Sequence, residues 1–217
     1  MDFRGAAPEH ERAIALAPGS AQVQRRYGQF VDNLGHFDRA IEALRRAVSL
    51  DPQNFLVHLG LGQGLGKARR YDEALAEFRA AAALVSDPKA VGGELAQTLL
   101  DAGDNDQARS MCESPATPLD DDDRPACLAQ AYHALGRVAD ALREMAKYKA
   151  LRGDRSSYEY GRIYACWGDT AEALRWLEKA EQLADPGFQS FRVDKCLDSI
   201  RQEPRFKAIE ARLNFPP

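Results

Sequence analysis

The segment GHFDRAIEALRRAVSLDP, residues 35–52, combines a tight turn, an amphipathic helix and a helix stop. Gly35 opens the unit because glycine adopts the left-handed backbone conformation that such a turn requires. Ala40 and Ala47 then place small side chains on one face of the helix, where a neighbouring helix can approach closely. Asp51-Pro52 prevents the helix from continuing. The segment therefore predicts a short helix that packs tightly against a partner.

The same unit recurs along the chain at a nearly constant interval. Alanines equivalent to Ala40 follow one another after 34, 34, 34, 33 and 32 residues: Ala6, Ala40, Ala74, Ala108, Ala141 and Ala173. A period of about 34 residues built from helix pairs is typical of the tetratricopeptide repeat, W-x2-L-G-x2-Y…A-x3-F…P. The sequence resembles this family over nearly its whole length. The resemblance implies an all-α fold, a right-handed superhelical solenoid of antiparallel helix pairs that ends in a C-terminal capping helix.

The family pattern also divides the chain. Tyr27-Gly28, Leu61-Gly62 and Tyr160-Gly161 stand where the family has Leu-Gly, whereas Gln24 replaces the family's Trp. We expect one domain over residues 1–217, with a half repeat (1–20), five repeats (21–54, 55–88, 89–121, 122–153 and 154–186) and a C-terminal cap (187–217). The last helix of this cap, from Phe206 to Leu213, is expected to cover the open end of the solenoid.

Composition and charge exclude several classes of function. The net charge is −4 and the isoelectric point is near 5.6, so no global basic field attracts nucleic acid or an anionic membrane. No apolar run approaches the ~20 residues that cross a bilayer. The first residues also lack the apolar core of a secretory signal. We therefore expect a cytoplasmic chain without a nucleic-acid or membrane partner.

The four cysteines, Cys112, Cys127, Cys166 and Cys196, stand far apart in the sequence. They form no Cys-x-x-Cys motif and have no histidine at ligand spacing, so we expect neither a disulfide framework nor a zinc site. Cys112 occupies the repeat position of Leu44 and Phe78, which favours the interpretation that it is a small core residue.

Four glycines alternate within one predicted helix, at positions 60, 62, 64 and 66. Each costs up to about 1 kcal/mol relative to alanine in a helix interior. One interpretation is close approach of a ligand backbone. The interpretation we favour is tight helix–helix packing, because Gly62 is a packing position in the family.

The third repeat departs from the pattern. Pro115 and Pro118 shorten its second helix, since proline disrupts a helix interior. The run Asp120–Asp123 then precedes Arg124-Pro125. The run lacks the spacing of a calcium loop, and we interpret it as a solvated loop that caps the next helix. We expect hinge-like loosening here, although a mere surface irregularity is the alternative.

No catalytic or nucleotide-binding motif occurs in the sequence. It contains no phosphate-binding loop, no His-Glu-x-x-His and no Gly-x-Ser-x-Gly. The four histidines come from different repeats, and structural roles are favoured for each. We therefore expect a protein that is not an enzyme and that has no cofactor and no metal.

The remaining candidate for a functional site is a binding surface on the solenoid. Stacked helix pairs place their leading helices on the concave side. The family register assigns the following residues to a partner-binding groove there, with Asp32 and Asp101 beside them: Arg25, Gln29, Asn33, Leu59, Gln63, Lys67, Gln97, Gln130, His133, Tyr158 and Arg162. Four of them are glutamines at one repeat position, and their amides could bond a peptide backbone. Alternatively, they are ordinary solvated helix residues.

The resemblance implies a non-catalytic scaffold that binds a peptide or protein segment in this groove. The carboxylate clamp of some family members is not carried over, because Gly60 and Ala90 occupy two of its positions. As an alternative, the tail is similar to the end of tetratricopeptide regions in bacterial regulators that carry winged-helix, adenylate-cyclase or kinase domains. The chain would then be a sensory or oligomerising module. The unpaired half repeat predicts either a trimmed longer protein or self-association.

Overall fold

The computed structural model describes residues 3–213 and 215, and all regular elements within these residues are helical. The α-helices are α1 (Phe3–Leu16), α2 (Ala21–Asn33), α3 (Phe37–Leu50), α4 (Phe55–Lys67), α5 (Tyr71–Ala83), α6 (Lys89–Ala102), α7 (Asn105–Glu113), α8 (Arg124–Ala134), α9 (Val138–Arg152), α10 (Ser157–Cys166), α11 (Thr170–Gln182) and α12 (Pro204–Leu213). Three 3-10 helices complete the list: η1 (Gly153–Ser156), η2 (Pro186–Ser190) and η3 (Lys195–Ile200).

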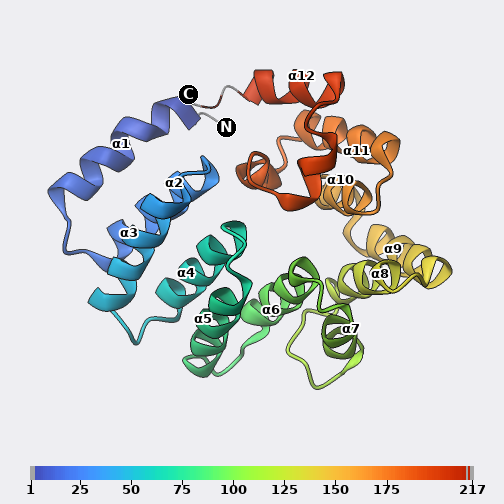
Figure 1. Cartoon of the computed structure of the whole chain (residues 1–217), viewed down its shortest axis with the longest axis horizontal. Coiled ribbons are helices and arrows are strands. Elements are labelled where there is room, and N and C mark those ends of the chain that lie inside the picture. The colour runs from blue at the N-terminus through green and yellow to red at the C-terminus, as the bar shows by residue number, and fades with distance from the viewer. Residues whose placement is uncertain (1–2, 214, 216–217) are drawn as a thin grey trace.

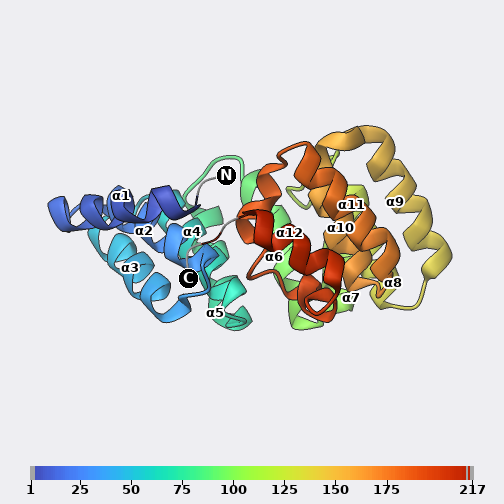
Figure 2. The same ribbon diagram turned by 90° about the horizontal axis from the view of Figure 1, so that it is seen from above.

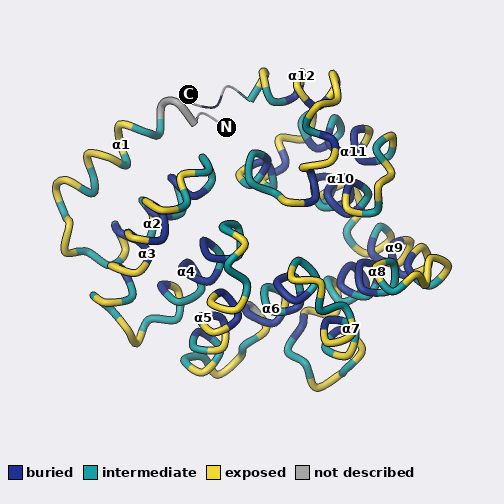
Figure 3. The backbone as a smooth tube through the Cα atoms, viewed as in Figure 1, coloured by how far each residue is buried: buried dark blue, intermediate teal, exposed yellow. Residues whose placement is uncertain are grey.

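Consecutive helices pack as antiparallel pairs, and the pairs stack into an arc (Figure 1). Helices α2, α4, α6, α8 and α10 lie on the inner side of the arc, and α3, α5, α7, α9 and α11 lie outside. Figure 2 shows the same arc from above, with α1–α5 in one half and α7–α12 in the other. Buried residues gather where the inner and outer helices face each other (Figure 3). The predicted all-α solenoid is therefore confirmed.

The turn within a pair uses a left-handed residue. Gly35 has a φ of 87°, and the N–H of the next residue, His36, returns to the carbonyl of Val31 at 3.0 Å. Arg69 occupies the equivalent turn of the second pair and has a φ of 61°. This conformation costs a residue with a side chain roughly 1–2 kcal/mol. An ion pair between Arg69 and Asp198 of the C-terminal segment accompanies the strained turn.

Glycines on the inner helices make room for large side chains from the outer helices. A Cβ on Gly62 would lie 2.6 Å from a ring carbon of Phe78, and a Cβ on Gly64 would lie 2.7 Å from Leu44. These contacts support the packing interpretation of the glycines in α4, and a Cβ on Gly60 would be less crowded, 3.2 Å from Arg25 of α2 and 3.4 Å from Leu44. Gly66 differs, because a Cβ there would meet no atom within 4 Å.

The prediction that the cysteines form no disulfides is wrong. Cys112 of α7 bonds to Cys127 of α8, with their Cα atoms 5.9 Å apart. Cys166, at the end of α10, bonds to Cys196 of η3, with a Cα–Cα distance of 4.6 Å. The partners are 15 and 30 residues apart in the sequence. Helix packing brings the partners together, and cysteines this far apart in the sequence form no short motif that would predict the bond. Cys112 is fully buried, as expected of a core residue.

Contacts around the irregular third repeat tie its loop to the helices. The guanidinium of Arg124 donates to the carbonyls of Cys112 at 2.7 Å, Ser114 at 2.8 Å and Thr117 at 3.3 Å. The Cys112–Cys127 bond closes the same loop. Both features oppose the hinge-like loosening that we expected. Asp123 precedes α8 but its side chain makes no capping bond; it accepts instead from Arg152 of α9.

The segment after α11 does more than cover the end of the solenoid. Helix α12 buries Phe206 and Ile209 in a cluster with Leu174 and Leu177 of α11, which is the cap that we expected. Before α12, η2 and η3 turn back toward the inner side of the arc (Figure 1). Lys195 donates to the backbone carbonyl of Asp101 at 2.5 Å. The η2–η3 segment thus contacts helices that lie far earlier in the chain.

Candidate concave-face binding site

The inner side of the arc contains two adjoining cavities, of about 650 Å³ and 380 Å³. The larger lies between α6, α8, α10 and the η2–η3 segment, and the smaller lies between α2, α4 and α6. We call the two together the inner groove. They have the following lining residues in common: Gly66, Lys67, Glu94, Gln97, Asp101 and Ser190.

Most of the residues predicted for a groove line these cavities: Gln29, Asn33, Gln63, Lys67, Gln97, Gln130, Tyr158 and Arg162, with Asp32 and Asp101. Three predicted residues do not line them. Arg25 lies beside the groove and donates to Gln29 at 2.8 Å. Leu59 packs against the apolar cluster of the first two pairs. His133 stacks on Trp167 with ring centroids 4.6 Å apart, because the helix turns its ring toward α10.

The glutamines of the predicted ladder bond mainly to one another and to charged neighbours. The Gln29 amide lies 3.4 Å from the Gln63 carbonyl oxygen, and the Gln63 amide donates to Glu94 at 2.7 Å. These amides are therefore engaged within the chain and form a polar lining. The expectation that they are open to a peptide backbone does not match their geometry.

Arg162 of α10 bonds to several other residues that line the groove. Its guanidinium donates to both carboxylate oxygens of Glu159, at 2.6 and 2.9 Å. It also donates to Gln97 at 2.8 Å and Gln130 at 3.0 Å, and it lies 3.5 Å from the sulfur of Cys196. Burial alone would lower its pKa, but the surrounding carboxylates, Glu159 foremost, hold the pKa above its usual value. Arg162 thus joins three helices and the C-terminal segment.

Carboxyl groups line the groove on both sides of Arg162. Burial raises the pKa of Glu94 and Asp101 because low-dielectric surroundings disfavour the charged form. Burial likewise raises the pKa of Asp194 to about 6, against the opposing effect of Arg162. Asp194 accepts a hydrogen bond from the Tyr158 hydroxyl at 3.3 Å. The groove is therefore polar and rich in carboxyl groups that are poorly solvated.

Sequence analysis missed several of these residues. Glu94 lies one helical turn before Gln97 on the same face of α6, so the register could have found it. Asp194 and Lys195 lie beyond the last repeat, where no period predicts their place. The fold of the η2–η3 segment alone brings them to the groove.

Other classes of site find no support among residues 3–213 and 215. No group of three or more His, Cys, Asp or Glu side chains in that range is arranged to hold a metal ion. Across the same residues, none of the helices is long and apolar enough to cross a membrane.

The fold and the groove define a helical-repeat solenoid with a polar concave face. Two family models, each described as tetratricopeptide repeat, match the chain, one at residues 2–55 and 31–91 and the other at residues 90–114, 126–147 and 155–179. Together they span most of the sequence, and the chain belongs to the tetratricopeptide repeat family.

Solved structures show the same fold at low sequence identity. The structure titled for pilF of Pseudomonas aeruginosa is 20% identical, with 89% of this chain and 90% of that chain covered and a TM-score of 0.56. A MamA protein is 20% identical (73% and 87% covered, TM-score 0.53). Yeast Tom70 is 18% identical (97% and 47% covered, TM-score 0.54). No curated protein sequence matches this chain.

Proposed function

We propose that this chain is a non-catalytic scaffold that binds an extended segment of a partner protein in the inner groove. Tetratricopeptide repeats are protein-interaction modules, and the family match carries that general function. The observation that supports binding in the inner groove is the pair of adjoining cavities along the inner helices. We take the chain as one unit of a half repeat, five repeats and a cap.

A side chain that fills the groove tests this proposal. Gly66 lines both cavities, and a Cβ there meets no atom within 4 Å, so Gly66→Trp obstructs the groove without disturbing the core. Gly19 also has open space around it and lies in the turn between α1 and α2, outside the cavities, so Gly19→Trp is the matched control.

Peptides selected from a random display library against the wild-type chain provide the probe. They are expected to bind the Gly19→Trp variant normally and to lose binding to Gly66→Trp. Equal binding to both variants would place recognition elsewhere on the surface. A library that yields no binder above background would contradict the scaffold itself.

We propose further that the chain works in an oxidising environment, which replaces the cytoplasmic expectation. Its two disulfides carry this proposal, because such bonds persist in oxidising compartments and are rare in reducing ones. Thiol counting, described in the Discussion, tests it. The alternative of a module within a larger bacterial regulator rests on the resemblance of the tail alone and stays a prediction.

Self-association through the half repeat is a second candidate that one observation favours. Leu16 of α1 is 76% exposed, more than the other exposed large apolar side chains of the described residues, and a second copy of the chain could cover it. Sedimentation velocity at several concentrations is expected to show a dimer that Leu16→Glu converts to monomer. A wild-type chain that stays monomeric at all concentrations would contradict it.

A further inference from the structure

Positive charges that line the larger cavity are partly neutralised within the chain. Lys67 pairs with Asp32 at 2.7 Å, and Arg162 pairs with Glu159 at 2.6 Å. Arg69 pairs with Asp198. Lys89 and Lys195 also line the cavity and form no ion pair within residues 3–213 and 215, although Lys195 donates to the backbone carbonyl of Asp101. The cations of the cavity are therefore only partly neutralised, and six carboxylates line it beside them: Glu94, Asp101, Asp120, Asp123, Glu159 and Asp194.

Among the residues that the structure describes, three carboxylates that line the same cavity lack an ion-pair partner. Within residues 3–213 and 215, Glu94, Asp101 and Asp194 have no lysine or arginine nitrogen within 4.0 Å. Their bonds come from neutral donors: the Gln63 amide to Glu94 at 2.7 Å, the Gln97 amide to Asp101 at 3.1 Å, and the Tyr158 hydroxyl to Asp194. Burial disfavours the charged form of these carboxyls, and cations such as Arg162 oppose that effect only from beyond 4.0 Å. An incoming positive group at close range therefore gains more here than at an exposed carboxylate.

A second carboxylate feature, in the smaller cavity, also favours a positively charged ligand. Asp32 lines the smaller cavity and is only 1% exposed. One of its oxygens, Oδ2, pairs with Lys67, whereas Oδ1 is buried without a hydrogen-bond partner. An unpaired buried carboxylate oxygen of this kind adds negative potential to the wall of the smaller cavity.

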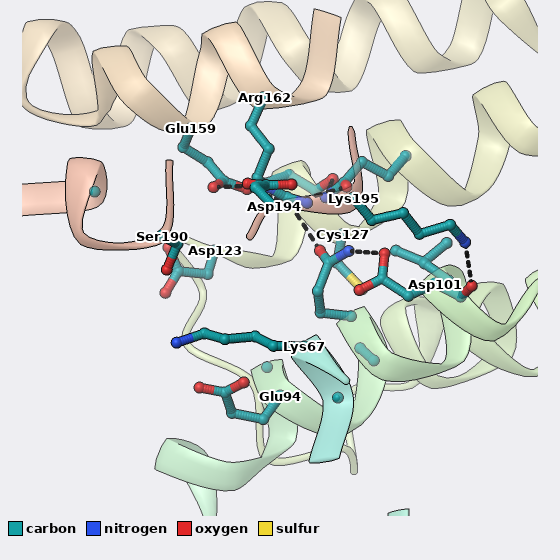
Figure 4. Close-up of a pocket in the computed structure, with 18 of the residues that line it drawn as sticks. Lys67, Glu94, Asp101, Asp123, Cys127, Glu159, Arg162, Ser190, Asp194 and Lys195 are labelled. Atoms are coloured by element: carbon teal, nitrogen blue, oxygen red, sulfur yellow. Dashed lines mark hydrogen bonds and ion pairs between the residues drawn. The ribbon is translucent and has the colours of Figure 1, made fainter. Parts of the chain in front are cut away.

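The carboxylates are spaced along the groove. Glu94 and Asp101 are seven positions apart on α6, which places them on one helix face about 10 Å apart along the axis. About three residues of an extended chain cover that distance. In Figure 4, Glu94 lies beside Lys67, Asp101 lies beside Lys195, and Asp194 lies near Arg162. Asp120 and Asp123 of the aspartate run also line the cavity; Asp123 pairs with Arg152, so Asp120 is the one that adds to the negative field.

We propose that the segment bound in the inner groove is basic. Lysine or arginine side chains about three residues apart would pair with Glu94 and Asp101, with Asp194 as a third carboxylate of the same cavity. This inference rests on the proposed scaffold function and specifies the chemistry of its partner. The aspartate run steers the basic segment toward the groove.

Fluorescence anisotropy with labelled peptides tests the proposal. The probes are three peptides of equal length: one with lysines at every third position, one with glutamates there, and one with glutamines. The lysine peptide is expected to bind at least tenfold more tightly than the other two, because charge-assisted hydrogen bonds discriminate by that order. Tighter binding of the glutamate or glutamine peptide would overturn the proposal and leave the scaffold function intact.

Neutralised variants locate the interaction. Glu94→Gln and Asp101→Asn are each expected to weaken the lysine peptide about tenfold. The control is Glu42→Gln, which makes the same charge change at an exposed position of α3 and is expected to leave affinity unchanged. Circular dichroism confirms folding of each variant. Equal losses in all three variants, or no loss at Glu94 and Asp101, would overturn the groove carboxylates as the binding groups.

The peptides selected from the display library separate this inference from the proposed function. If they bind in the groove and are enriched in lysine and arginine, both stand. If Gly66→Trp abolishes their binding but their sequences carry no positive bias, the scaffold stands and the basic partner fails.

Discussion

The guanidinium of Arg162 donates a 2.8 Å hydrogen bond to Gln97, a residue 65 positions earlier in the chain. The bond runs from α10 to α6 across the larger cavity. Because the same side chain also bonds Glu159 and Gln130, it fixes the far side of the groove in one geometry. This bond therefore ties α10 to α6 and shapes the site.

Removing the guanidinium of Arg162 is expected to destabilise the fold. Arg162→Met leaves Glu159 without its cation and should lower the free energy of unfolding by roughly 3 kcal/mol. Arg175→Met is the control, since the Arg175–Glu172 pair is more than one-third exposed on both side chains and should cost less than about 1 kcal/mol. Urea titration of both variants measures the difference. Equal costs would mean that Arg162 is no more than a surface residue.

Replacing glycine by alanine is expected to have opposite effects on stability at two positions of α4. Gly62→Ala places a Cβ against the ring of Phe78 and should cost about 1–3 kcal/mol through overpacking. Gly66→Ala meets no neighbour and should stabilise the helix by up to about 1 kcal/mol. Thermal and urea unfolding check both. A stabilising Gly62→Ala would show that the pair α4–α5 packs less closely than described.

The disulfides predict a thiol count. The unreduced chain, unfolded in guanidinium, should show no reactive thiol, and the reduced chain should show four. Peptide mapping should recover Cys112 linked to Cys127 and Cys166 linked to Cys196. Replacing either pair by serine should lower the free energy of unfolding by about 3–4 kcal/mol, because each bond restricts the unfolded chain. Free thiols in the unreduced protein would contradict the pairing and the oxidising environment.

The Cys166–Cys196 bond should also hold the C-terminal segment in place. Limited proteolysis is expected to cut between residues 186 and 201 faster in the variant with Cys166→Ser and Cys196→Ser than in wild type. The variant without the Cys112–Cys127 bond serves as the control, because that bond lies in another repeat. Similar cleavage rates in both variants would show that packing alone anchors the segment.

Asp194 predicts a pH dependence of stability. Its pKa is raised from the usual 3.8 to about 6, chiefly by burial, with Arg162 acting in the opposite direction and Glu159 and Asp101 adding to the rise. Between these two values the folded chain binds a proton that the unfolded chain does not. The contribution of Asp194 to stability should therefore rise as pH falls from 6 toward 4, and it should be constant and unfavourable above pH 7.

Comparison with Asp194→Asn isolates this effect from other titrating groups. The wild-type chain should gain stability relative to the variant as pH falls from 7 to 5, in urea titrations at each pH. Parallel stability curves for the two chains over this range would contradict the raised pKa of Asp194.

Local sequence patterns predict much of the architecture. The recurrence of Ala40-type positions, turn residues such as Gly35 and stops such as Pro52 define helix length and pairing, because each depends on a few neighbouring residues. The register also predicts which helix faces point inward, and it assigns Gln63, Gln97 and Arg162 to the inner side, where they line the groove. The pattern could not predict which of these side chains bond to one another.

The sequence by itself determined the repeat period, the helical fold and the inner placement of the leading helices, since these follow from local spacing and the family resemblance. Only the tertiary structure decided the two disulfides, the hydrogen bonds of Arg162 to Gln97 and Gln130 and the contribution of Asp194 to the groove. Each of these joins residues that are distant in the chain. Their proximity depends on the accumulated curvature of the stacked pairs and on the return of the η2–η3 segment to the inner side of the arc, and neither leaves a periodic signal in the sequence.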